Sequence, residues 1–250
     1  MCPGLARYRT RRKRPIGAPP NRRPDATLID ALILGALILG ANPVIRLSPS
    51  LVAQTVSLAL AFAAPALAQT PPTRDPAQIQ AGTYAVDPGH TQVGFTVSHM
   101  GFSNYSGGFS DVSGTLELQP KTPAAAKLSI KIPVASVMTT SEKLTGELKG
   151  DQWLHAGKFP EMTFASTKVT PEGKDKAKVT GDLTLHGVTK PVTLTVTLVG
   201  AGVNPLNKKV TVGFEATGTL KRSDFGVKTY VPLIGDDLHL TIAGAFERKE

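Results

Sequence analysis

Hydrophobic and polar residues alternate along most of the chain beyond residue 82. In segment 91–98 the apolar residues Val93, Phe95 and Val97 occupy every second position. A period of two is that of a β-strand with one apolar face and one hydrated face. The same alternation returns in seven further segments, 112–118, 128–134, 162–164, 179–185, 192–198, 210–220 and 238–246. The pattern therefore predicts eight strands.

Two stretches depart from this alternation. In segment 141–155, Leu144 and Leu148 are four residues apart, which predicts a short helix. Ser141 stands before it as a candidate N-cap. In segment 101–108 glycines gather around Phe102 and Tyr105, which predicts a sharply bent loop that is a candidate lid or entrance.

Strands with one hydrated face and short connections favour antiparallel pairing over βαβ units. Such strands form a sandwich or close into a barrel, and closure removes the exposed edges. An eight-stranded barrel is filled by its own side chains or holds one small elongated ligand. We expect an all-β fold, an eight-stranded antiparallel barrel with a short helical insert, and the pattern leaves both kinds of interior open.

The first part of the chain has a different composition. Eleven of the 20 prolines lie before residue 77, and two apolar runs cover 31–41 and 51–68. The second run ends in Ala66-Leu67-Ala68, a small-x-small pattern of signal-peptidase sites. We predict an N-terminal extension and signal peptide over 1–68, cleaved near Ala68, and a periplasmic or secreted product. Residues 69–81 are predicted to be a linker without structure of its own, and 82–249 the barrel domain. A retained membrane anchor is the alternative.

Charge and motifs exclude several functions. The net charge is +9, but nine of the 28 Lys and Arg residues lie before residue 50, so the predicted barrel is nearly neutral and nucleic-acid binding is not expected. The one cysteine, Cys2, lies in the segment expected to be removed. Neither G-x-S-x-G nor H-E-x-x-H occurs, and no histidines have metal-ligand spacing. We expect no catalysis, no metal and no cofactor other than a bound isoprenoid lipid or quinone.

Several separated motifs carry a resemblance to a known family. They are DPGH at 87–90, VGFTVSHMG at 93–101, VTGDLTLHGVTKPV at 179–192, GFEA at 213–216 and KRSDFG at 221–226. This set, in this order, resembles the YceI-like polyisoprenoid-binding proteins and covers about 82–247. The resemblance implies a lipocalin-like barrel whose long apolar tunnel holds an isoprenoid or another long-chain amphiphile.

Candidate ligand-binding residues follow from the inward faces of the strands and from the motifs. They are Val93, Phe95, Val97, His99, Phe102, Leu116, Ile130, Phe164, Leu185, Val196, Phe214, Phe225 and Ile242. For each apolar residue, ordinary core packing is the alternative. A lipid chain gains about 0.8 kcal/mol per buried methylene, so a continuous apolar wall binds it without any special residue. Strict alternation points His99 inward, toward a ligand or a backbone partner.

Polar candidates for the tunnel mouth are few. They are His90, His99, Tyr105, Arg222 and Asp224. We expect His90 to cap the turn at 87–89, and Arg222 and Asp224 to pair or to brace a turn. His186, in a turn between strands, is expected to be exposed.

The sequence is compatible with three functions. The first is an exported binding protein for a polyisoprenoid or fatty amphiphile, used in transport, storage or stress. The second is a quinone-linked redox accessory or enzyme, and the third a structural stress protein with a filled core. Transient membrane contact and a homodimer are compatible with the first.

Overall fold

The computed structural model describes residues 71–250, which form one sheet of eleven strands, one α-helix and four short 3-10 helices. The strands are β1 Gly82–Val86, β2 Gln92–His99, β3 Ser103–Phe109, β4 Ser113–Leu118, β5 Lys127–Pro133, β6 Val137–Met138, β7 Glu161–Glu172, β8 Lys176–Leu185, β9 Val188–Val203, β10 Val210–Lys221 and β11 Asp237–Arg248. The helices are η1 Pro76–Gln78, η2 Pro123–Ala125, η3 Val134–Ser136, α2 Glu142–Lys149 and η4 Arg222–Phe225. In this part of the chain we find no helix with the length and hydropathy of a membrane span.

Eight of the strands close into a ring. Their order is β1-β4-β5-β7-β8-β9-β10-β11, and β1 pairs again with β11. Every pairing is antiparallel, so the predicted all-β barrel of eight antiparallel strands is confirmed. Strands β2, β3 and β6 extend the sheet beyond the ring, because β11 pairs with β1 through residues 246–248 and with β2 through residues 239–243.

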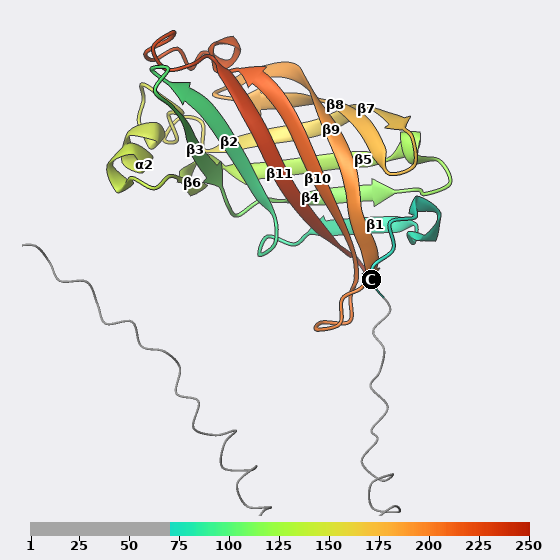
Figure 1. The fold of residues 1–250 in the computed structure, drawn as a ribbon. Coiled ribbons are helices and arrows are strands. Elements are labelled where there is room, and N and C mark those ends of the chain that lie inside the picture. The colour runs from blue at the N-terminus through green and yellow to red at the C-terminus, as the bar shows by residue number, and fades with distance from the viewer. Residues whose placement is uncertain (1–70) are drawn as a thin grey trace, which may run out of the picture. The chain divides into compact units, whose positions relative to one another are not determined.

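The barrel has two unlike ends (Figure 1). One end, the helix end, carries α2, the turn between β2 and β3, and η4 with the segment that follows it. The opposite end, the hairpin end, carries η1, η2 and the turn between β7 and β8. The helical insert is confirmed at the helix end, where the Ser141 hydroxyl accepts from the Leu144 amide at 3.3 Å.

The predicted glycine-rich loop over 101–108 is wrong. Residues 103–109 form β3, which pairs with β2 from Val93–Phe109 to His99–Ser103, and only residues 100–102 turn. A Cβ atom at Gly107 would lie 2.4 Å from Cζ of Phe95, so this glycine makes room for a ring on the facing strand. Gly107 thus serves packing and Gly101 serves the short turn with φ 72°, so the segment forms no lid of this length.

The linker was also predicted wrongly where the structure describes it. Thr73 and Ala201 exchange two backbone hydrogen bonds of 2.8 Å, and Asp75 caps η1 through the Ala77 amide. Ile79 packs against the core. The proline-rich, polar composition of this segment predicts neither the strand bridge between Thr73 and Ala201 nor the packing of Ile79 against the core. The predicted extension and cleavage site at 1–68 lie outside the described residues.

Candidate ligand cavity

Two apolar cavities occupy the interior of the barrel. The larger has a volume of about 300 Å³ and reaches the hairpin end, and the smaller has about 140 Å³ and reaches the helix end. Both are lined by Val93, Ile132, Leu183 and Leu240. The two cavities therefore adjoin within the barrel, and these four side chains form the boundary between them.

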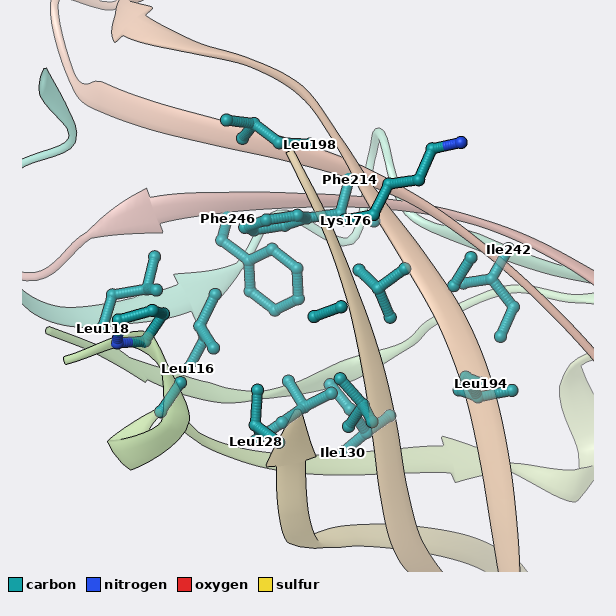
Figure 2. A pocket seen from close by; sticks show the side chains of 18 of the residues that line it. Leu116, Leu118, Leu128, Ile130, Lys176, Leu194, Leu198, Phe214, Ile242 and Phe246 are labelled. Atoms are coloured by element: carbon teal, nitrogen blue, oxygen red, sulfur yellow. The ribbon is translucent and has the colours of Figure 1, made fainter. Parts of the chain in front are cut away.

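The first cavity is surrounded by strands of the closed ring. Figure 2 shows Leu128 and Ile130 on one side of the space, with Phe214 and Phe246 opposite. The Thr91 hydroxyl is buried in this wall, and it is satisfied by the amide and carbonyl of Ala245 at 3.0 and 3.2 Å. The middle of the cavity thus offers a ligand apolar contact and no free hydrogen-bonding group.

At the hairpin end the lining changes character. Pro76 and Ile79 from the η1 segment meet Pro120 and Pro123 from the connection between β4 and β5. Charged residues 174–176 of the turn between β7 and β8 complete this rim. The amine of Lys176 points away from the apolar side chains (Figure 2), so the charge stays at the surface while the stem covers the cavity.

The second cavity is enclosed differently. Its strand walls come mainly from β2, β8 and β11, but Trp153 and Leu154 come from the stretch after α2, and Val227 and Ile234 from the segment after η4. These two irregular segments are tied together, because the Thr229 hydroxyl donates to the Gln152 carbonyl. The helix end of the interior is thus closed by loops as well as by strands.

Arg222 organises this loop wall. The residue is only 3% exposed, and its guanidinium donates to four backbone carbonyls, those of Gly235 (2.9 Å), Val227 (3.0 Å), Thr229 (2.9 Å) and Ile234 (2.9 Å). The guanidinium also lies 5.5 Å from the ring centre of Trp153. Burial lowers the pKa of Arg222, opposed by the charge of Asp236, and an arginine keeps its proton in proteins. Arg222 therefore braces the segment after η4, as expected from the sequence, and its guanidinium is held by hydrogen bonds to backbone carbonyls.

Asp236 and Asp224 have separate partners. Asp236 accepts from the Ser223 amide at 2.9 Å and from the Ser223 hydroxyl at 2.7 Å, which fixes the start of η4. Burial raises the pKa of Asp236, but these hydrogen bonds and the charges of Lys221 and Arg222 outweigh it, and the pKa is lowered overall. Asp224 pairs with Lys190 at 3.1 Å, so the alternative of an Arg222–Asp224 pair is wrong.

Ten of the thirteen candidate residues line the cavities. Seven line the first cavity, namely Val93, Leu116, Ile130, Phe164, Val196, Phe214 and Ile242, and four line the second, namely Val93, Phe95, Val97 and Leu185. The period of two identified these positions because an inward face in a barrel is also a cavity face. Whether they contact a ligand stays a prediction.

Three candidates lie elsewhere. His99 is exposed at the last position of β2, where the chain leaves the barrel through the turn 100–102, so alternation no longer decides its direction. Phe102 lies in that turn and is 89% exposed. Phe225 is 2% exposed and packs in the core beside η4, yet it lines neither cavity. The structure therefore places none of the three in the wall of either cavity.

The other histidines also have structural surroundings. His90 Nδ1 lies 2.7 Å from Asp87 Oδ2, which confirms that it caps the turn. His186 was expected to be exposed, but its ring packs 4.7 Å from the ring of Phe159, and Nδ1 lies 3.2 Å from the Phe225 carbonyl. Its Nε2 is buried without a hydrogen-bond partner in the described chain. The turn is covered by the stretch after α2, which local sequence does not reveal.

Inward-facing glycines keep the interior hollow. Gly181 lies on the same face of β8 as Leu183, and a Cβ there would approach Phe164 Cζ to 2.4 Å and the Ala165 carbonyl oxygen to 2.6 Å. Gly107 accommodates Phe95 in the same way. Each aromatic ring lies over its glycine instead of projecting across the lumen. Sequence reasoning assigned Gly107 to a bend. It also missed Ile79 and Trp153 as lining, together with three of the four boundary residues, Ile132, Leu183 and Leu240.

Within residues 71–250 no group of three or more His, Cys, Asp or Glu side chains is placed to hold a metal ion. The lining residues of both cavities include no histidine and no cysteine. The arrangement is suited to enclosing an apolar chain.

Known proteins share this fold and sequence. The model of the YceI-like domain matches residues 84–246. Protein YceI of Escherichia coli O157:H7 is 40% identical over 154 residues, which is 62% of this chain and 80% of that protein. The crystal structure of Campylobacter jejuni YCEI protein is 33% identical, with a TM-score of 0.55 over 61% of this chain and 90% of that one.

Two further structures extend the likeness. BcnA of Burkholderia cenocepacia is 26% identical, with a TM-score of 0.58 over 64% of this chain and 98% of that one. A polyisoprenoid binding domain from Saccharophagus degradans, implicated in plant cell wall breakdown, has a TM-score of 0.51 at 14% identity, over 68% of this chain and all of that one, which is a likeness of fold. The domain match and the identity to protein YceI establish that this chain belongs to the YceI-like family.

Proposed function

We propose that this protein is an exported, non-catalytic binding protein that holds one polyisoprenoid or similar long-chain amphiphile inside its barrel. The observation that carries the proposal is the pair of adjoining apolar cavities, which together run from the hairpin end to the helix end. Export is supported by the signal-peptide pattern that ends at Ala68, from which we infer a periplasmic or secreted protein.

The shape of the interior favours a chain over a compact ligand. A lipid chain gains about 0.8 kcal/mol for each methylene that it buries, so tight binding needs a long chain. Two cavities in series provide room for that length. Charged residues 174–176 lie at the hairpin-end rim. Deeper in the lining, the Thr91 hydroxyl and the Arg222 guanidinium are already bonded to backbone atoms. Selectivity therefore depends on chain length and bend, with the polar headgroup left at one end.

The polyisoprenoid class is supported by the family and by the fold shared with the Saccharophagus degradans domain. A core filled by the protein's own side chains is disfavoured, because close-packed interiors contain few voids larger than a water molecule. The cavities, at about 300 and 140 Å³, far exceed such voids.

Native mass spectrometry of the purified mature protein tests the proposal, followed by organic extraction. We expect a bound species of defined mass that extracts as a long-chain lipid, and uptake of added polyprenol by the stripped protein. An empty barrel that ignores polyprenols and fatty acids of every length would refute it.

A blocking substitution at the boundary tests the path. Leu240 lines both cavities, whereas its neighbour Thr241 is exposed on the outer face of β11. We expect Leu240→Trp to abolish uptake of long prenols and to spare chains short enough for one cavity. Thr241→Trp, which adds the same ring outside, is the matched control and should bind like wild type. Equal uptake by both variants would place the chain elsewhere.

A further inference from the structure

The helix end exposes large apolar side chains that pack against little. Met100 and Phe102, in the turn between β2 and β3, are 51% and 89% exposed. Tyr230, Val231 and Leu233, in the segment between η4 and β11, are 64%, 36% and 62% exposed. We call these five residues the apolar rim.

The two segments of the rim are joined. The Met100 amide donates to the Leu233 carbonyl at 2.9 Å, and the Gly235 amide donates to the Ser98 carbonyl at 2.8 Å. In Figure 1 the turn after β2 and the segment before β11 lie side by side at the same end of the barrel. The apolar rim is thus one surface built from residues more than a hundred positions apart.

The charge of the rim segments is unusual for an exposed surface. Residues 98–109 contain no Asp, Glu, Lys or Arg, and residues 226–235 contain a single charged residue, Lys228. A surface without carboxylates and with one lysine is compatible with anionic headgroups, which repel acidic surfaces. Trp153, whose ring lies 6.2 Å from that of Tyr230, adds an aromatic pair of the kind enriched at membrane–water interfaces.

The rim adjoins the interior. Ile234 follows the exposed Leu233 and lines the second cavity, and Trp153 and Val227 line the same cavity beside it. One continuous apolar surface therefore runs from the exposed turns into the barrel. An alkyl or isoprenoid chain that moves between a bilayer and the cavity along this surface avoids exposure to water.

We propose that the apolar rim docks on a phospholipid bilayer and that the chain enters and leaves the barrel through the second cavity. Phe102 and Leu233 insert among the headgroups and upper acyl chains, and Lys228 lies toward the headgroups. The proposal deepens the proposed function and rests on it, because it names the source of the ligand and the end through which it passes.

The hairpin end supplies the control surface. Leu206, in the turn between β9 and β10, is 90% exposed, about as much as Phe102, but it lines neither cavity. Lys208 and Lys209 follow it in the same turn. Leu206→Ser therefore removes an equally exposed apolar side chain without touching the rim.

Vesicle flotation measures docking directly. The full mature chain is mixed with vesicles of dioleoylphosphatidylcholine, alone or mixed with phosphatidylglycerol, and the floating fraction is quantified. We expect Phe102→Ser and Leu233→Ser each to lower the partition coefficient about tenfold, the effect of losing one inserted apolar side chain. Leu206→Ser should partition like wild type. Equal flotation of wild type and both rim variants would overturn the inference.

A second pair of assays separates this inference from the proposed function. Capacity is measured with a polyprenol added from solvent, and transfer with the same polyprenol embedded in the vesicles. We expect the rim variants to keep full capacity and to lose transfer rate about tenfold or more. Normal capacity with unchanged transfer rates refutes the docking surface alone, whereas absent capacity in wild type refutes the proposed function.

A second copy of the chain is the competing occupant of the rim. Sedimentation at several concentrations gives the oligomeric state of wild type and of Phe102→Ser. We expect the same monomeric mass for both. A dimer that Phe102→Ser dissociates, together with unchanged flotation, would assign the rim to self-association and overturn the inference.

Discussion

The two cavities adjoin, but they are built in different ways. The first is enclosed mainly by strands of a closed ring, in which each strand is hydrogen-bonded on both sides, and loops line it at the hairpin end. The second is lined mainly by β2, β8 and β11, with single residues from four other strands and from α2, and irregular segments close the remainder. These segments depend on a few side chains, above all Arg222. We therefore expect the wall of the first cavity to stay closed, and the loop wall of the second cavity to open at a lower cost in free energy.

Removing Arg222 is the strongest test of this difference. Arg222→Met keeps most of the side-chain volume but leaves four carbonyls without their donor, and we expect a loss of about 3 kcal/mol or more in the free energy of unfolding. Hydrogen exchange should accelerate in residues 226–236 and 150–156 and stay slow in β4, β5 and β7. Denaturant unfolding and exchange mass spectrometry measure the two effects.

The control is the neighbouring cation. Lys221 is exposed on the outside of the barrel, where it pairs with Asp237 at 2.8 Å. Lys221→Met should leave the unfolding midpoint nearly unchanged, because exposed ion pairs contribute little. Uniform acceleration of exchange around the whole barrel in Arg222→Met would show that the two compartments are not independent.

Adding one methyl group to the wall of each cavity tests which of the two walls is stiffer. Gly181→Ala pushes on Phe164 and on the Ala165 carbonyl inside the closed ring, and we expect a cost of about 1–3 kcal/mol. Gly107→Ala, in β3, pushes on Phe95 of β2. Because β3 pairs only with β2 and with two residues of β6, relaxation should reduce the cost. Thermal or denaturant melts of both variants give the order.

Gly213 provides the matched control for these substitutions. A Cβ there would have its nearest neighbours at 3.8 and 3.9 Å, which is ordinary van der Waals contact. Gly213→Ala should therefore unfold like wild type. If Gly107→Ala proves as costly as Gly181→Ala, the second compartment is as rigid as the first.

Acid should weaken the loop wall before the strand wall. The pKa of Asp236 is lowered in the folded protein. Its contribution to stability is therefore complete above the unfolded pKa of about 4, and it is lost as the pH falls from there through the lower folded pKa. We expect wild type to lose more stability than Asp236→Asn between neutral pH and about pH 3. Parallel pH titrations of the unfolding midpoint measure this, and Asp237→Asn, an exposed neighbour, should follow wild type.

Sequence reasoning reached the strand walls of the cavities more fully than the irregular segments, for a physical reason. Residues such as Ile130 and Val196 lie on strands, where a period of two fixes which side chains face inward. Trp153 and Ile234 lie in irregular segments, whose direction depends on contacts distant in the chain. The guanidinium of Arg222 donates hydrogen bonds to carbonyls up to 13 residues away, and no local sequence pattern predicts these contacts. Gly107 was misleading because glycine signals bends and ring contacts alike.

A stabilising substitution in α2 tests whether the helix end opens independently of the barrel. Gly146 lies inside α2, and nothing lies within 4 Å of the Cβ that an alanine would add. Gly146→Ala should therefore stabilise the helix by up to about 1 kcal/mol. Since α2 buries no residue fully, we expect it to open locally before the barrel unfolds. The gain should then appear as slower hydrogen exchange in α2, with little change in the global midpoint. A rise of the global midpoint by the full amount would mean that α2 unfolds only together with the strands, and that the loop wall is as permanent as the ring.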